Sequence, residues 1–139
     1  MATRPKLRGG RSRCPLHLAL EVLGDRWTLL VLRDLMLKDR DTFKAMLEAE
    51  EGIATNILSD RLARLEAEGI VARRADPADA RRVRYRLTEK GLDLAPVLVE
   101  MMVWSATYHD TAAPAAEVAE MRDRRAGYLK RIRQQAASR

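Results

Sequence analysis

Cys14 and His17 are the first residues whose chemistry stands out, because they lie one helical turn apart and offer a thiol and an imidazole. A thiolate nucleophile needs such a base, but an active site also needs a group that orients the base. The sequence has one other histidine, His109, and contains neither a glycine-rich phosphate loop nor a set of metal-ligating residues. We therefore expect no enzyme activity, no metal and no cofactor.

A second group of candidate side chains lies between Ala54 and Glu68, where leucines at 58, 62 and 65 predict the buried face of a helix. The opposite face combines short polar side chains with alanines, so its backbone can approach the major groove of DNA closely. Asparagine can read adenine there, arginine can read guanine, and hydroxyls can contact bases or phosphates. An ordinary solvent-exposed face with an i,i+4 ion pair is the alternative. The residues expected to contact DNA are Thr55, Asn56, Ser59, Asp60 and Arg64, with Lys44 from the preceding segment.

Arg61 belongs to the same segment but lies nearer the leucine face than the outer face. We expect its guanidinium to hold a carboxylate inside the domain, and we keep it as a secondary candidate for DNA contact.

Arginines are concentrated in the segment that follows, at positions 73, 74, 81, 82, 84 and 86. Alternation places Arg82, Arg84 and Arg86 on one face of a strand, opposite apolar residues. We expect Arg81, Arg82 and Arg84 to meet phosphates or the minor groove. A charged edge strand that resists aggregation is the alternative, but it does not explain why nearly every charge is positive.

The elements that position these residues follow from periodicity and capping signals. A short helix, a turn that contains Gly52, a longer helix and a basic hairpin form the order of a winged helix-turn-helix, mainly α with a small β-hairpin. Pro96 either kinks the helix that contains it or marks the true first turn. The expected helices are 15–23, 26–37 (capped by Asp25), 43–49 (capped by Thr42), 54–68, 88–108 and 115–135, and the expected strands are 70–74 and 83–87 around a turn at 76–79.

Three regions are expected along the chain of 139 residues. Residues 1–13 form a flexible basic arm, residues 14–91 form the DNA-binding domain, and residues 92–139 form C-terminal helices for dimerisation. The helix around Trp104 is too apolar to be covered on one face only, so a second copy is expected to cover the rest. Alternatively, the last helix covers it within one chain, or both arrangements occur. The predicted dimer contacts are Leu94, Val97, Leu98, Met101 and Trp104.

Composition supports a polyanionic partner, since 26 Lys and Arg against 20 Asp and Glu give a net charge of +6. A single cysteine excludes an intrachain disulfide, and the apolar runs are too short for a membrane span. We expect a cytoplasmic protein with no membrane partner. A cavity between the helices of Trp27 and Trp104 is compatible with the sequence, but nothing identifies a small-molecule effector.

Order and spacing from Cys14 to Trp104 resemble the HxlR-type winged-helix regulators, which are related to the MarR type. The resemblance implies a dimer built on the terminal helices, a reading helix that begins at Ala54, and control of neighbouring genes. Ala54 departs from the usual hydroxyl cap, so Thr55 is expected to cap instead. Asp60 stands where a neutral or basic residue is common; it would repel phosphate but can accept from a cytosine amino group. The resemblance rests on Cys14-Pro15, residues 20–35 (LEVLGDRWTLLVLRDL), Gly52-Ile53, residues 58–62 (LSDRL), residues 65–71 (LEAEGIV) and residues 83–91 (VRYRLTEKG).

Some HxlR-type regulators sense electrophiles or oxidants through a cysteine at the Cys14 position, so the resemblance implies a redox sensor. Arg11, Arg13 and the helix N-terminus would favour its thiolate. The alternative is a small buried residue that packs under the first helix.

We therefore expect a sequence-specific DNA-binding regulator, a repressor that binds a two-fold operator as a homodimer. The alternative is a protein-interaction module that does not bind DNA and uses the apolar C-terminal helix.

Overall fold

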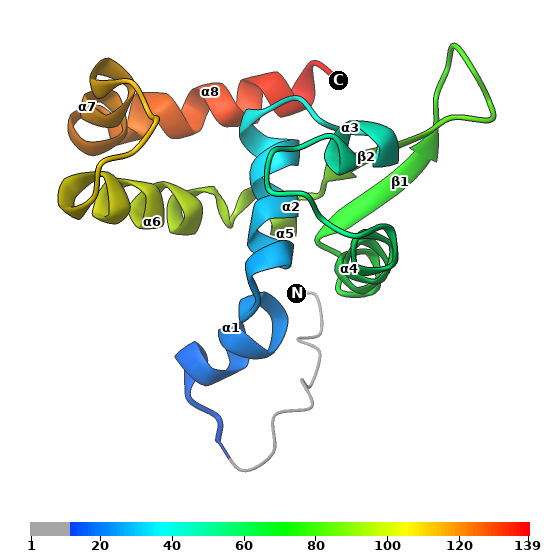
Figure 1. Ribbon diagram of the computed structural model, residues 1–139, viewed down its shortest axis with the longest axis horizontal. Coiled ribbons are helices and arrows are strands. Elements are labelled where there is room, and N and C mark those ends of the chain that lie inside the picture. The colour runs from blue at the N-terminus through cyan, green and yellow to red at the C-terminus, as the bar shows by residue number, and fades with distance from the viewer. Residues whose placement is uncertain (1–11) are drawn as a thin grey trace.

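The computed structural model describes residues 12–139, which form a set of packed helices with one two-stranded antiparallel hairpin at an edge (Figure 1). The predicted winged helix-turn-helix architecture is confirmed. Most of the predicted basic arm, residues 1–11, lies outside the described residues. The elements are α1 (Pro15–Leu23), α2 (Arg26–Leu37), α3 (Phe43–Leu47), α4 (Thr55–Ala67), β1 (Val71–Ala75), β2 (Val83–Leu87), α5 (Glu89–Leu92), α6 (Ala95–Tyr108), α7 (Ala115–Asp123) and α8 (Arg125–Ala137).

Side-chain caps define three of the helix starts. Asp25 accepts from the backbone amides of Trp27 and Thr28, and Thr42 accepts from the amide of Ala45, as the sequence predicts. Thr88 accepts from the amide of Gly91 in the same way. Each cap satisfies an amide that has no partner within its helix.

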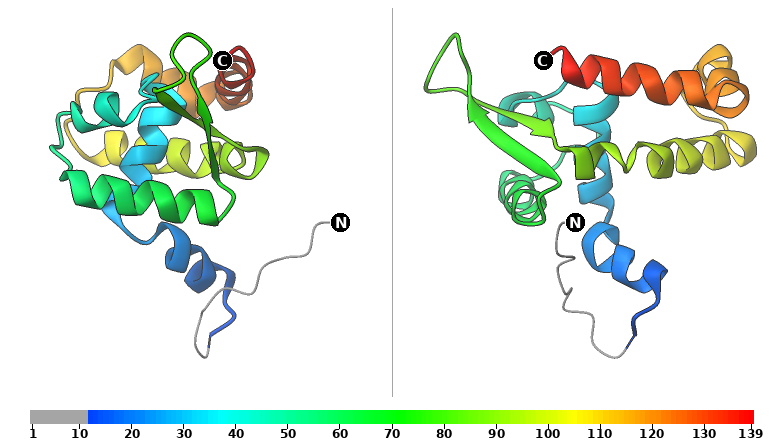
Figure 2. Two further views of the ribbon diagram at one scale, coloured as in Figure 1. Left: turned by 90° about the vertical axis from the view of Figure 1, so that its right-hand side faces the viewer. Right: turned by 180° about the vertical axis from the view of Figure 1, so that it is seen from behind.

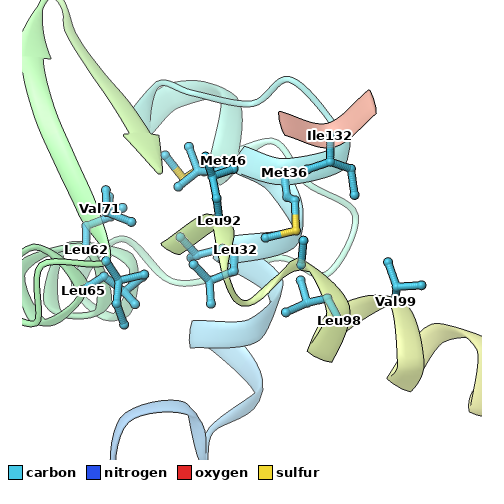
Figure 3. Packing of buried hydrophobic residues seen from close by; sticks show 14 of the residues in the cluster. Leu32, Met36, Met46, Leu62, Leu65, Val71, Leu92, Leu98, Val99 and Ile132 are labelled. Atoms are coloured by element: carbon cyan, nitrogen blue, oxygen red, sulfur yellow. The ribbon is translucent and has the colours of Figure 1, made fainter. Parts of the chain in front are cut away.

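The core is organised around α2, which packs against α4, α6 and α8. Leu32 is fully buried, and Met36 lies close to Leu98 of α6 and Ile132 of α8 (Figure 3). Side chains from the winged-helix segment and from the C-terminal helices therefore share one hydrophobic cluster. The two regions expected on either side of position 92 thus have a common core.

The helix expected over 88–108 is two helices in the structure. The chain turns at Asp93 and Leu94, and Pro96 lies in the first turn of α6, where its missing N–H costs nothing. The second of the two predicted roles of Pro96 is thus confirmed.

The single helix expected over 115–135 is wrong. The chain breaks at Arg124 (φ −128°, ψ 41°), and α8 turns back to lie beside α6, as Figures 1 and 2 show. No proline or glycine marks this break, so tertiary packing decides it: Met121 on one side and Tyr128 on the other are both buried.

Helix α1 projects from the body of the molecule, and none of its residues is buried (Figure 1). Gly24 is its C-cap, and this position suits glycine because a Cβ would lie 2.3 Å from the carbonyl oxygen of Leu20. Among residues 12–139, no helix has the length and apolarity that a membrane crossing requires.

Candidate nucleic-acid interface

Helix α4 separates an apolar face from a polar one, as its leucine spacing predicts. Leu58, Leu62 and Leu65 are buried with 0–2% exposure. The residues expected to read DNA are all exposed on the outer side of the helix, and they are Thr55, Asn56, Ser59, Asp60 and Arg64.

The start of α4 differs from the expectation. Ala54 is the N-cap, no side chain accepts from the first amides, and Thr55 is the first helical residue. The prediction that Thr55 caps the helix is therefore wrong, and its hydroxyl is not committed to a capping bond.

The turn before α4 is held onto α2 by an ion pair that the sequence does not reveal. Gly52 has φ +71°, a conformation that favours glycine. Next to it, Glu51 accepts two hydrogen bonds from the guanidinium of Arg33, at 2.6 and 2.8 Å. These bonds lower the pKa of Glu51 to about 2, so its carboxylate stays charged and the turn stays tied to α2.

Arg61 holds a carboxylate within the domain, as expected. Its Nε donates to Oδ2 of Asp25 at 3.0 Å, and this contact joins α4 to the α1–α2 junction. Burial opposes ionisation of Asp25, but hydrogen bonds from Thr28 and Arg61 outweigh that effect and the pKa of Asp25 is lowered.

The hairpin lies on the same side of the molecule as α3 and α4 (Figure 2, left). Its strands pair in register from Val71 opposite Leu87 to Ala75 opposite Val83. The loop between them is closed at its base, where the Asp76 amide donates to the Arg82 carbonyl at 2.7 Å.

Arg84 differs from the other predicted phosphate contacts because it is paired within the chain. Its Nη1 donates to Asp41 at 2.8 Å and its Nε donates to Asp76 at 2.9 Å, so two of the three guanidinium nitrogens are engaged within the chain. These bonds raise the pKa of Arg84. The physical reason is that β2 lies against the loop before α3, where the Tyr85 amide also donates to the Asp41 carbonyl at 2.8 Å.

The other wing arginines are exposed. Arg82 precedes β2 and lies in the loop, and the side chain of Arg81 is 95% exposed, with only a distant contact to Asp79 at 3.8 Å. Lys44 is exposed on α3, which packs against α4. Exposed cations thus lie on the same side of the molecule as the outer face of α4.

Cys14 occupies the N-cap position of α1 and is exposed, so the alternative of a buried packing residue is wrong. The backbone amides of His17 and, next, Leu16 lower the pKa of its thiol. His17 itself lies 3.4 Å from the carboxylate of Glu21. Within residues 12–139, no group of three or more acidic, histidine or cysteine side chains is arranged to hold a metal ion.

Helix α6 exposes part of the face that the sequence predicts to bind a second copy. Val97, Met101 and Trp104 are 43%, 50% and 60% exposed, and Leu94 is half-buried. Leu98 differs from the other predicted contacts, because it is only 5% exposed and packs mainly in the core of its own chain.

Two leucines of α1 are also exposed and were missed as contact residues. Leu16 and Leu20 are 68% and 56% exposed. Their i,i+4 spacing is visible in the sequence, but periodicity alone does not tell whether the chain itself covers such a face.

A groove of about 630 Å³ lies between α2 and α6, where the sequence allows a cavity. Leu29 and Leu30 line one wall, and Leu98, Met101 and Met102 line the other. Arg33 and Glu51 also border it, so it extends to the turn before α4.

With this geometry in place, comparison with known proteins identifies the family. The profile of the HxlR-like helix-turn-helix family matches residues 22–113. The chain belongs to this family of transcriptional regulators. The HTH-type transcriptional regulator sll1512 of Synechocystis sp. is 39% identical over 88 residues, or 63% of this chain and 64% of that relative, so the match spans less than two thirds of the relative's length.

Two solved structures of regulators are also similar. The reduced form of the transcriptional regulator YodB from B. subtilis is 35% identical with a TM-score of 0.57, over 70% of this chain and 95% of that one. The redox regulator HypR in its oxidized form is 29% identical with a TM-score of 0.62, over 70% of this chain and 100% of that one.

Proposed function

We propose that this chain is a sequence-specific DNA-binding repressor that acts as a homodimer on a two-fold operator. The observation that carries the proposal is the exposed polar face of α4, which lies on the same side of the molecule as the exposed arginines of the hairpin. A dimer on such an operator would repress by occluding a promoter.

In this proposal α4 enters the major groove. Asn56, Asp60 and Arg64 follow one another at intervals of four residues, so their side chains form a stripe along the outer face. Thr55 and Ser59 flank the stripe with hydroxyls that can contact bases or phosphates. Lys44 would bind the phosphate backbone from α3.

The wing contributes phosphate or minor-groove contacts through Arg81 and Arg82, whose side chains are exposed. Arg84 supports the wing from inside through Asp41 and Asp76. Because Arg81 and Arg82 are exposed while Arg84 is paired within the chain, we expect DNA affinity to depend on the first two and fold stability to depend on the third.

The dimer is proposed to form through the apolar face of α1 and α6, which is defined by Leu16, Leu20, Val97, Met101 and Trp104. Large exposed apolar side chains are what a symmetric interface requires. The leucines of the partner's α1 are the proposed occupants of the groove between α2 and α6. Two reading helices related in this way would lie about 34–36 Å apart, one turn of DNA.

DNA binding is tested by selecting fragments from random DNA with the purified chain and measuring affinity at several salt concentrations. We expect a palindromic site, and Arg82→Ala should reduce the slope of log affinity against log salt by about 0.9 for each phosphate that the variant no longer neutralises. Asn56→Ala should change the preferred base at one position of each half-site.

Arg122→Ala is the matched control, since it removes the same charge from α7, which lies far from the hairpin in Figure 1. An equal loss in Arg122→Ala and Arg82→Ala would show that only net charge matters. Weak binding without sequence preference would favour the protein-interaction module instead.

The dimer is tested by sedimentation of Leu20→Glu and of the exposed control Lys130→Ala. We expect the wild type and the control to sediment as dimers and Leu20→Glu as a monomer, since a buried unpaired carboxylate opposes association. A Leu20→Glu dimer would contradict the proposed interface.

We also propose that Cys14 makes this regulator responsive to oxidants, supported by its exposure and its lowered pKa. With diamide, two Cys14 thiols from two chains would lose their hydrogens to the diamide and join as a disulfide. The test compares DNA affinity of wild type and Cys14→Ser before and after diamide. Equal responses of the two proteins would contradict the proposal.

A further inference from the structure

Asp60 is the one acidic residue of the stripe on α4, and its side chain is 54% exposed. A carboxylate on a DNA-facing helix repels phosphates and the acceptor atoms of most base edges. Its surroundings therefore decide whether it weakens binding or contributes to reading.

Arg61 joins Asp60 to the scaffold of the domain. Its Nη1 donates to Oδ2 of Asp60 at 2.5 Å, while its Nε donates to Oδ2 of Asp25 at 3.0 Å. Asp25 is itself fixed as the N-cap of α2, where it accepts from the amides of Trp27 and Thr28. The side chain of Arg61 is only 21% exposed, so the guanidinium that joins the two carboxylates is largely covered by the rest of the domain.

This arrangement compensates the charge of Asp60 and leaves one of its oxygens free. Oδ2 faces Arg61 and lies 3.9 Å from Nη1 of Arg64. Among the hydrogen bonds of residues 12–139, none ends on Oδ1 of Asp60. The exposed carboxylate therefore offers an oriented acceptor, and its repulsion of phosphate is reduced by two neighbouring guanidinium groups.

We propose that Asp60 reads the amino group of a cytosine in each half-site and that Arg61 is the positioning residue that orients it. Only cytosine and adenine present an amino donor in the major groove, and adenine places the N7 acceptor beside it, which a carboxylate disfavours. Guanine and thymine present acceptors at the corresponding place. The inference rests on the proposed function, because it requires α4 to enter the major groove.

The first test selects binding sites from random DNA with wild type and Asp60→Ala. The wild type should prefer cytosine at one position of each half-site, and Asp60→Ala should lose that preference while binding random DNA more tightly. Asp60→Ala that keeps the cytosine preference would overturn the inference. A wild type that binds no DNA would overturn the proposed function as well, so the two failures are distinguishable.

The second test removes the amino group instead of the side chain. Operator DNA in which that cytosine is replaced by 2-pyrimidinone, which has hydrogen in place of the amino group, should bind wild type roughly 10-fold more weakly. Asp60→Ala should bind both DNAs equally. Equal binding of both DNAs by wild type would overturn the inference.

Arg61 is tested by Arg61→Met and Arg61→Lys, with folding checked by circular dichroism. Arg61→Met should reduce cytosine discrimination, and Arg61→Lys should restore part of it, since an ammonium keeps the charge but loses the planar fork. A merely structural role of Arg61 would lower affinity for all sites equally and leave the base preference unchanged, which would overturn its assignment as a positioning residue.

Discussion

The side of the molecule that carries α4 and the hairpin differs from the side formed by α1 and α6 in how side chains find partners. On the first side, Arg33, Arg61 and Arg84 each bind carboxylates of the same chain. On the second, Leu20 and Trp104 are 56% and 60% exposed. The side proposed to read DNA is thus braced by the chain's own contacts, whereas α1 and α6 present apolar side chains that the rest of residues 12–139 leaves exposed.

On the side that carries α4 and the hairpin, buried polar groups find their hydrogen-bond partners within the chain. Within residues 12–139, every buried side-chain nitrogen and oxygen has a hydrogen-bond partner. Internal carboxylates fix the positions of α4 and the hairpin, and the arginines that remain exposed are free for a polyanion. An arginine-rich segment must therefore be divided by its contacts before a function is assigned to each residue.

The largest difference should be seen in fold stability when a buried leucine and an exposed leucine are each replaced. Leu62→Ala should reduce the free energy of unfolding by about 2–5 kcal/mol, because Leu62 is 2% exposed and its removal leaves a cavity. Leu20→Ala should instead lower stability mainly at high protein concentration and make it less sensitive to concentration than that of the wild type, since it weakens association and not the core of the single chain. Urea unfolding followed by circular dichroism at two protein concentrations measures both effects.

The same measurement can contradict the distinction between the two sides. If Leu20→Ala lowered the urea midpoint as much as Leu62→Ala at every concentration, α1 would be covered by its own chain. The apolar face of α1 and α6 would then not be a surface that awaits a partner.

A smaller difference should be seen between two nearby arginines of the wing, in thermal stability and in the salt dependence of DNA binding. Arg84→Ala removes the partner of Asp41 and Asp76, so it should lower the Tm while leaving the salt slope of DNA binding unchanged. Arg82→Ala should do the opposite, because Arg82 is exposed in the loop. Differential scanning fluorimetry and salt titrations compare the pair. A reduced salt slope in Arg84→Ala would show that Arg84 contacts phosphate after all.

Much of the fold could be predicted because it depends on interactions between residues that are close in the sequence. The caps formed by Asp25 and Thr42 and the buried leucines of α4 follow from short-range patterns that the sequence displays directly. Even the internal role of Arg61 follows from its place on the helix, nearer the leucine face than the outer face.

The remaining features depend on residues that are distant in the chain. Arg84 pairs with Asp41, and Arg33 pairs with Glu51, across separations that periodicity does not encode. The break at Arg124 has no local signal either, because packing of α8 against α2 and α6 produces it. Strand alternation assigns Arg84 to a face, but only the fold supplies the carboxylates on that face.

The weakest effect concerns the ion pair that holds the turn before α4. Folding lowers the pKa of Glu51 from 4.5 to about 2, so the pair stabilises the fold fully above about pH 4.5 and loses its contribution as the pH falls toward 2. Glu51→Gln should therefore cost roughly 1 kcal/mol at pH 7, allowing for solvent screening, and progressively less at lower pH. Urea unfolding between pH 7 and pH 3 measures the difference between wild type and variant. A difference that stayed constant over this range would mean that the charge of Glu51 does not brace the turn, and the contrast between the braced reading side and the uncovered apolar side would lose one of its three ion pairs.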